Sequence, residues 1–434
     1  MRVSKYTFLL EENKKYWVYN SLSNSMLSID EAYYRYIENA RKMNKDLPDD
    51  CFEKEDYDEL VQKKIITQND KDDFLILKNI IMNYRLTNNS INITIAPTLD
   101  CNYACHYCFE KTKKSYADSG TCNAIAKYIN KHLKFKSLLI TWFGGEPLLA
   151  LNEMQEIYFQ IDKAALRSYS SSIITNGFLL DKKAVRILEK IAVKSIQLTL
   201  DGMKEQHNKI KFTKDCRDTF SKTIQNIDDF ASLNSPIHLN IRVNITKDNA
   251  DDYISLYKFI TQRYAASKNI GVLPAFVKDV GGCDNSCILK KSESIQYLQR
   301  IWNEHQLLPS NYIYPSNNFY ECAVRNKKTL AIGPEGEVYK CWEIIGNKDY
   351  VVGYVQHDEF ILTNPKIMNR YLYGADPFES PVCSKCTYLP VCLGGCPHSR
   401  IENEFNNKKN DVCAIWKKDI THFLKMELIR KGHV

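Results

Sequence analysis

The stretch TLDCNYACHYCFE, residues 98–110, places Cys101, Cys105 and Cys108 in one short segment directly after a predicted β-strand. Three thiolates at this spacing can bind three irons of a [4Fe–4S] cube and leave the fourth iron open to a small molecule. A structural zinc site instead closes four protein ligands. Because the next cysteine, Cys122, falls in a predicted helix, we interpret the segment as an iron–sulfur site, with zinc or inert thiols as the alternatives.

The overall composition is that of an ordinary globular protein. The chain has 434 residues, of which 44% are hydrophobic and 26% charged, and its net charge is +7. The lysine-rich stretches at 111–114 and 408–409 lack interleaved aromatic residues, so we expect no nucleic-acid partner. No apolar run reaches the roughly 18–20 residues that span a bilayer, and the N-terminus lacks a signal-peptide pattern. We therefore expect a cytoplasmic protein with no membrane partner.

The 15 cysteines are the most informative feature of the composition. In a reducing compartment, clustered cysteines are metal ligands more often than disulfide partners. Two ordered series stand out, the three cysteines of residues 98–110 and seven more between Cys322 and Cys413.

The sequence pattern divides the chain into three regions. Residues 1–87 predict two strands, at 5–11 and 16–20, followed by helices at 29–42 and 56–66. This order is typical of a small winged-helix-like module, which more often binds a protein or a nucleic acid than carries out chemistry.

Residues 88–314 alternate between strands and helices, beginning with the apolar alternation at 91–95. Further strands are predicted at 138–143, 171–175, 195–200, 238–244 and 270–276, with helices at 122–133, 153–167, 182–191, 220–230 and 251–262. Such repeats predict an α/β fold in which a parallel sheet closes partly into a (β/α)6 barrel, with its site at the C-terminal strand ends. Residues 315–434 predict a loop-rich domain whose thin core needs metal to hold together.

Several polar and glycine-containing segments end the predicted strands. Gly144 and Gly145 allow a close approach of the backbone to a ligand, and the Glu146 carboxylate can accept hydrogen bonds from an ammonium group. Asn176 and Asp201 each precede a glycine, so ordinary turn chemistry is the alternative for these two segments.

The Cys-x3-Cys-x-aromatic-Cys segment resembles the cluster motif of the radical S-adenosylmethionine (SAM) superfamily. The resemblance implies that the open iron binds SAM, whose cleavage gives methionine and a 5′-deoxyadenosyl radical that removes a substrate hydrogen. It assigns SAM contacts to Tyr107, Gly144, Gly145, Glu146, Asn176, Thr199 and Asp201. Lys211 stands where a similar family segment usually carries arginine; it loses the bidentate fork and is not predicted to bind SAM. No catalytic residue is assigned.

The later cysteines resemble the SPASM domain, a twin-cluster extension of peptide-modifying radical SAM enzymes. The resemblance implies two auxiliary [4Fe–4S] clusters, hence three clusters in all. Their ligands are Cys322, Cys341 and Cys396 for the first, and Cys383, Cys386, Cys392 and Cys413 for the second. The first cluster then has an open iron, unless Cys283 or Cys287 completes it. A zinc ribbon is the alternative for the Cys-x2-Cys pair.

Together these features predict a maturase of a ribosomally made precursor peptide (a RiPP maturase), which installs a cross-link, with a thioether favoured over a carbon–carbon bond. Its partners are a peptide leader, paired with a strand at 5–11 or 16–20, and an electron donor such as a ferredoxin or flavodoxin. One alternative is an anaerobic sulfatase-maturating enzyme, which makes formylglycine. Those enzymes carry Asp where this chain has Trp342. An alternative of another class is a non-catalytic, metal-stabilised binding or regulatory protein.

Overall fold

The protein is described by a computed structural model. It covers residues 1–48, 51–86, 89–105, 108, 110, 112–132, 134, 136–213, 215, 217–277, 287–308, 310–317, 319 and 321–434. The chain forms two compact units. The barrel unit comprises Asn88–Tyr297 and Asn326–Leu372, and the terminal unit comprises Met1–Thr87, Leu298–Arg325 and Tyr373–Val434. The three domains expected from the sequence, 1–87, 88–314 and 315–434, stay a prediction.

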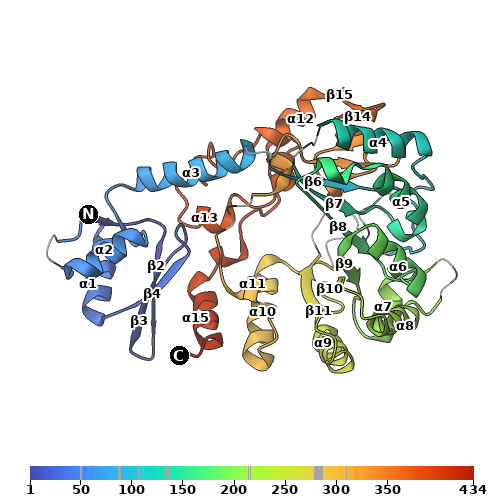
Figure 1. The fold of residues 1–434 in the computed structure, drawn as a ribbon. Helices are drawn as coiled ribbons and strands as arrows, with labels where there is room; N and C mark the ends of the chain where they lie inside the picture. The colour runs from blue at the N-terminus through green and yellow to red at the C-terminus, as the bar shows by residue number, and fades with distance from the viewer. Residues whose placement is uncertain are drawn as a thin grey trace. The chain divides into compact units, whose positions relative to one another are not determined.

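Six parallel strands form the centre of the barrel unit (Figure 1). They are β6 (Ser90–Ile95), β7 (Ser137–Trp142), β8 (Ser168–Thr175), β9 (Val193–Thr199), β10 (His238–Ile245) and β11 (Ile270–Phe276). Neighbours in the sheet follow the order of the chain, as expected when each crossover is a short helical unit. The predicted α/β fold with a parallel sheet is confirmed.

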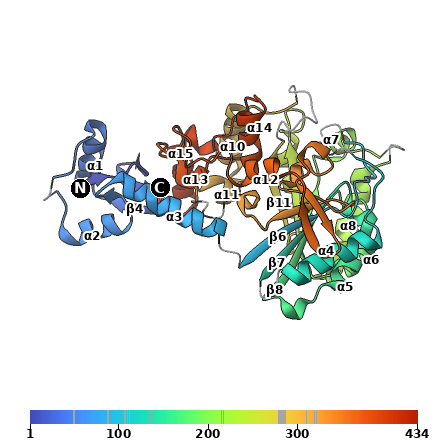
Figure 2. The same ribbon diagram turned by 90° about the horizontal axis from the view of Figure 1, so that it is seen from above.

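Helices cover one face of this sheet, as the two views in Figures 1 and 2 show. They are α4 (Ser119–His132), α5 (Leu151–Gln160), α6 (Lys182–Lys190), α7 (Lys204–Ile210), α8 (Thr219–Ser232) and α9 (Asp252–Arg263). The strand residues on one face, such as Ile93, Ile140 and Ile241, are fully buried or nearly so. Alternate residues on the other face, such as Thr94 and Asn240, are polar and line a cavity.

The sheet continues beyond β6 with strands that the sequence did not predict. β12 (Leu330–Ile332) pairs parallel to β6, and β13 (Glu337–Tyr339), β14 (Gly353–Gln356) and β15 (Glu359–Leu362) follow in antiparallel order. Helix α12 (Pro365–Leu372) completes the barrel unit. Residues 330–362 were expected to be loop-rich, because strands of three or four residues are too short to show a clear alternation.

In the terminal unit, β2 (Thr7–Glu12), β3 (Lys15–Asn20) and β4 (Ser25–Ile29) form an antiparallel sheet in that order. Asn13 and Lys14 both have positive φ, which suits the tight turn between β2 and β3. Because β3 is hydrogen-bonded on both sides, the expectation that residues 16–20 offer a free strand edge is wrong.

The same part of the chain also forms helices α1 (Glu31–Met43), α2 (Lys54–Gln62) and α3 (Asp70–Leu86). A separate pair of short strands is made by β1 (Arg2–Val3) and β5 (Ile66–Thr67). The other helices are α10 (Lys291–His305), which begins in the barrel unit, α11 (Ser310–Ile313), α13 (Leu389–Cys392), α14 (Pro397–Phe405) and α15 (Ile420–Arg430). Side chains of α15 pack against β2 and β3 in a shared apolar core. No described helix has the length and apolar composition needed to cross a bilayer.

Candidate active site

The cysteine segment is held against the end of β7 by its backbone. Gly145 N–H donates to the Thr98 carbonyl at 3.2 Å, and Glu146 N–H donates to the Asp100 carbonyl at 2.8 Å. A Cβ on Gly144 would lie 2.2 Å from the Thr98 oxygen, and one on Gly145 would lie 2.3 Å from the Asp100 oxygen. The two glycines therefore permit a close approach of the cysteine segment itself, in addition to lining a cavity.

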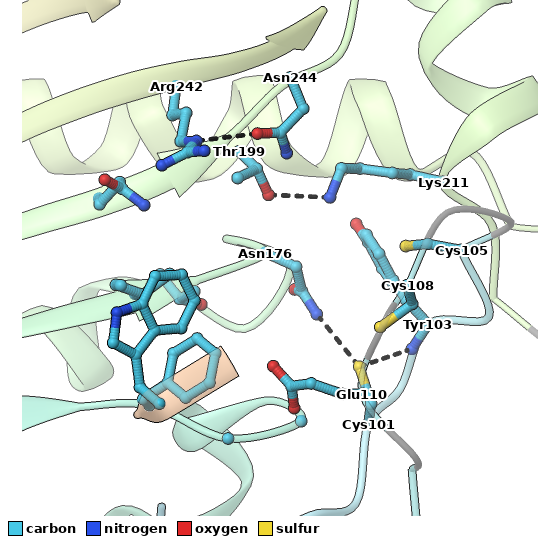
Figure 3. Close-up of a pocket in the computed structure, with 17 residues that line it drawn as sticks. Cys101, Tyr103, Cys105, Cys108, Glu110, Asn176, Thr199, Lys211, Arg242 and Asn244 are labelled. Carbon is cyan, nitrogen blue, oxygen red and sulfur yellow. Dashed lines mark hydrogen bonds between the residues drawn. The ribbon is translucent and has the colours of Figure 1, made fainter. Parts of the chain in front are cut away.

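Cys101, Cys105 and Cys108 line one cavity of about 160 Å³ at the C-terminal ends of the parallel strands (Figure 3). Tyr103 N–H donates to the Cys101 sulfur at 3.4 Å, and the Asn176 side-chain amide lies 4.0 Å from that sulfur. The structure thus brings together the three cysteines that the sequence predicted. Tyr107, predicted to contact SAM, lies outside the described residues.

The three thiols are buried and lie close enough to influence one another by charge, which suits the binding of a cationic group. Burial raises the pKa of all three thiols, to about 11 for Cys108, and the neighbouring cysteines raise the pKa of Cys101 further. Among the described residues, no three His, Cys, Asp or Glu side chains already surround a metal position. A cation bound among these thiols would favour their ionised form, so the donor set fits an iron cluster.

Glu146 is fully buried, and protein groups already engage its carboxylate. It accepts hydrogen bonds from Leu148 N–H at 3.0 Å, the Thr175 hydroxyl at 2.7 Å and Asn176 N–H at 2.8 Å. These bonds join the ends of β7 and β8. Burial raises the pKa of this carboxyl, and Glu146 is not among the residues that line the cavity. Its predicted contact with SAM stays a prediction.

Replacing Glu146 with alanine is expected to destabilise the barrel unit by about 3 kcal/mol or more, because three buried donors lose their acceptor at about 1–3 kcal/mol each. Glu146→Gln, which retains one carbonyl oxygen, is expected to fall between alanine and wild type. Thermal unfolding of the cluster-containing protein measures the effect. Asn152→Ala, at an exposed position, is the control. Equal unfolding temperatures for Glu146→Ala and Asn152→Ala would contradict this role.

The ends of β8 and β9 supply two further predicted residues, since Asn176 and Thr199 both line the cavity. The Asn176 side chain also donates to the Asn102 side-chain oxygen at 2.8 Å. Asp201, in contrast, is fully buried, and its carboxylate accepts a hydrogen bond from Asn244 N–H at 2.9 Å. It is not among the lining residues, so its predicted contact with SAM also stays a prediction.

Five cavity residues with charged or amide side chains were not predicted: Glu110, Gln197, Lys211, Arg242 and Asn244. Lys211 lines the cavity, where its ammonium group donates to the Thr199 hydroxyl at 2.9 Å and lies 3.7 Å from the Asp201 carboxylate. Arg242 and Asn244 also line it and are joined by a 2.8 Å hydrogen bond from the guanidinium Nε (Figure 3). Arg242 and Asn244 are two residues apart on β10 and therefore share one face of the strand, a signal that could have identified them.

A second cavity of about 410 Å³ lies on the polar face of the sheet. Phe143, Ile174, Gln197, Arg242 and Trp342 line both cavities, which therefore adjoin. The rings of Phe143 and Trp342 meet edge to face with centroids 5.0 Å apart. Trp342 thus forms an apolar wall directly after Cys341.

All four cysteines predicted to bind the second auxiliary cluster lie in the terminal unit, at Cys383, Cys386, Cys392 and Cys413. Leu393, Gly394 and Gly395 all have positive φ, and a Cβ on Gly395 would lie 1.8 Å from the Val412 carbonyl oxygen. The segments that carry Cys392 and Cys413 are therefore in backbone contact.

The surroundings of Cys392 are suited to a bound cluster. Burial raises the pKa of its thiol, and hydrogen bonds from backbone N–H groups of Ala414 and Gly394 act in the opposite direction. Cys413 and Cys386 raise the same pKa by their charge, as expected for thiols that share a site. Backbone N–H groups directed at a sulfur are a usual feature of iron–sulfur sites, so these residues fit such a cluster.

The remaining predicted ligands are divided between the units. Cys341 is buried in the barrel unit, whereas Cys322 and Cys396 belong to the terminal unit. Cys287 accepts a hydrogen bond at its carbonyl from Lys247 N–H at 2.9 Å, and Cys283 lies outside the described residues. The ligand set of the first auxiliary cluster stays a prediction.

Comparison with known proteins supports the resemblance that the cysteine segment indicates. Residues 95–260 match the family model of the Radical SAM superfamily. The radical SAM cyclopropyl synthase TigE of Paramaledivibacter caminithermalis is 25% identical over 368 residues, which cover 75% of this chain and 72% of TigE.

Two solved structures share the fold. Native anSMEcpe with bound AdoMet and Cp18Cys peptide has a TM-score of 0.59 at 19% identity, covering 79% of this chain and 97% of that one. Streptococcus suis SuiB bound to precursor peptide SuiA has a TM-score of 0.52 at 15% identity, covering 95% and 99%.

The family match runs from the last residue of β6 into α9 and so includes the cysteine segment and most of the cavity around it. Members of this superfamily are enzymes that use SAM and a [4Fe–4S] cluster, and the three thiols at the strand ends fit that cluster. This chain therefore contains a radical SAM domain at residues 95–260, within the barrel unit.

Proposed function

We propose that this enzyme is a peptide maturase that installs a cross-link in a ribosomally made precursor. The observation that carries the proposal is the pair of adjoining cavities, one bordered by three cysteines and the other extending for about 410 Å³ along the polar face of the sheet. The second cavity has room for a peptide side chain. The names of TigE, anSMEcpe and SuiB support the same reaction class, since they mention cyclopropyl synthesis or bound peptides.

When bound, a [4Fe–4S] cluster with an open iron supplies the electron that cleaves SAM into methionine and a 5′-deoxyadenosyl radical. In this proposal Cys101, Cys105 and Cys108 hold that cluster. Lys211 and Arg242 place positive charge on the cavity wall, where a carboxylate such as that of the methionine portion would be stabilised. The second auxiliary cluster takes Cys383, Cys386, Cys392 and Cys413, and the first takes Cys322, Cys341 and Cys396.

The leader peptide is proposed to pair with β4, an edge strand of the three-stranded sheet. Next to β4 is a cavity of about 160 Å³ lined by Asp30, Asp56 and Glu59. Among the described residues, none of these three carboxylates has an ion-pair partner. A leader with Lys or Arg beside its paired segment therefore complements this edge. β2, which covers most of residues 5–11, one of the two segments expected from the sequence, packs against α15.

A sulfatase-maturating activity is the second candidate, because the chain is also 23% identical over 350 residues to a cysteine-type anaerobic sulfatase-maturating enzyme of Clostridium novyi. The Trp342 wall favours the cross-linking maturase, since an indole ring cannot act as the base expected at this position. It provides a surface for an apolar side chain instead.

Co-expression of this enzyme with candidate precursor peptides, sought among the neighbouring open reading frames, tests the proposal by mass spectrometry. The expected result is a loss of two hydrogens per cross-link, absent when Cys101 is replaced by alanine. Alkylation then separates the bond types, because a thioether removes a reactive cysteine and a carbon–carbon bond does not. Replacement of a cysteine sulfur by oxygen together with the loss of two hydrogens would instead establish the formylglycine reaction.

A further inference from the structure

Two cationic side chains of the terminal unit point at cysteine sulfurs. Arg400, on α14, donates from Nη1 to the Cys383 sulfur at 3.4 Å. Lys417 donates from Nζ to the Cys413 sulfur at 3.5 Å. Cys383 and Cys413 are two of the four proposed ligands of the second auxiliary cluster. The two cations come from different segments, so each can be removed without the other.

The guanidinium of Arg400 is held in place independently of the sulfur. Its Nε donates to the Ala375 carbonyl at 2.7 Å, and Nη2 of Arg325 donates to the same oxygen at 3.2 Å. Arg325 in turn lies 3.2 Å from the Glu321 carboxylate, a buried group that also pairs with Arg85. Because this network fixes the plane of Arg400, its remaining N–H groups are oriented before any cluster binds.

The N-terminal strands contribute a third cation near the same site. The Lys5 ammonium group donates to the Ser384 carbonyl at 3.1 Å, within the segment between Cys383 and Cys386. The Thr387 hydroxyl donates to the Lys5 carbonyl. The segment that carries two proposed ligands is therefore bonded directly to residues at the start of the chain.

We infer that Arg400 and Lys417 raise the reduction potential of the second auxiliary cluster. The inference rests on the cluster ligands given in the proposed function. Reduction adds one electron and no bond forms or breaks, so the reduced cluster carries one more negative charge. Positive charge and N–H donors at the sulfurs stabilise that reduced state more than the oxidised one.

The two cations are expected to act with different strength. Arg400 is partly buried and anchored, whereas Lys417 is exposed, so water and salt weaken the effect of Lys417 more. Raising the ionic strength is therefore expected to reduce the contribution of Lys417 and to leave that of Arg400 nearly unchanged.

The test is a redox titration with dithionite, followed by electron paramagnetic resonance, in the full-length chain carrying Cys101→Ala, Cys105→Ala and Cys108→Ala. This chain is expected to hold about eight irons in two cubes. With Arg400→Gln added, one of the two midpoint potentials is expected to become more negative while the other stays constant. Lys417→Gln is expected to give a smaller shift of the same sign.

Lys418→Gln is the matched control. Lys418 is also exposed and is the next residue after Lys417, so this variant removes the same charge at a neighbouring position. Equal potentials in the Arg400, Lys417 and Lys418 variants would overturn the inference. If Arg400→Gln binds only about four irons, the exposed Lys417 variant decides the question on its own. If the parent chain itself binds about four irons, the proposed ligand set fails, which is a separate result.

Discussion

Replacing Cys101, Cys105 and Cys108 with alanine is expected to remove about four of about twelve irons and to abolish SAM cleavage. The three thiols share one cavity wall at the strand ends, and the other proposed ligand cysteines lie in segments outside it. The auxiliary clusters should therefore remain in the variant. Iron analysis and the rate of 5′-deoxyadenosine formation under a strong reductant measure the two effects.

Cys122→Ala provides the control for this variant. Cys122 is fully buried in α4 and is not among the residues that line the cavity, so its loss should leave both the iron content and the cleavage rate close to wild type. A triple variant that still produces 5′-deoxyadenosine would refute the assignment of these three cysteines. A variant that loses all its iron would show that the three sites do not load independently.

The six parallel strands could be predicted because each has six to eight residues and alternates apolar side chains against the helices. The shorter elements could not. β4 and β12 are specified by pairing with β3 and β6, a tertiary contact that leaves little local pattern. Helix α5 was predicted to reach residue 167 but ends at Gln160. Directly after it, the Asp162 side chain caps a separate short helical turn, Lys163–Ala165.

The site could be predicted where the chemistry depends on residues close in sequence. The spacing of the three cysteines and the glycines after β7 needed no knowledge of the fold. The role of Glu146 did, because its acceptor capacity is used by Thr175 and Asn176 at the end of the next strand. Alternation along β10 places Arg242 and Asn244 on one face of that strand, but the position of Arg242 in the cavity also depends on the pairing of β10 with β9.

Replacing Gly145 with alanine is expected to lower the rate of SAM cleavage by about a hundredfold or more. The new Cβ would lie 2.3 Å from the Asp100 oxygen and 2.8 Å from the Leu99 oxygen, and both atoms belong to the backbone. Relief of that contact requires the cysteine segment to move by about 1 Å, a displacement that can cost about two orders of magnitude in rate. Single-turnover formation of 5′-deoxyadenosine measures the loss.

Gly120→Ala is the matched control, since a Cβ at that position of α4 meets only the flexible Asp118 side chain, at 3.3 Å. This variant is expected to keep the wild-type rate, because alanine is favourable within a helix. The comparison also separates two roles for Gly145. If the glycine only admits a ligand, its replacement weakens SAM binding and leaves the cluster spectrum intact. Displacement of the cysteine segment instead alters the cluster spectrum before SAM is added, and the contact with Asp100 makes this the expected result.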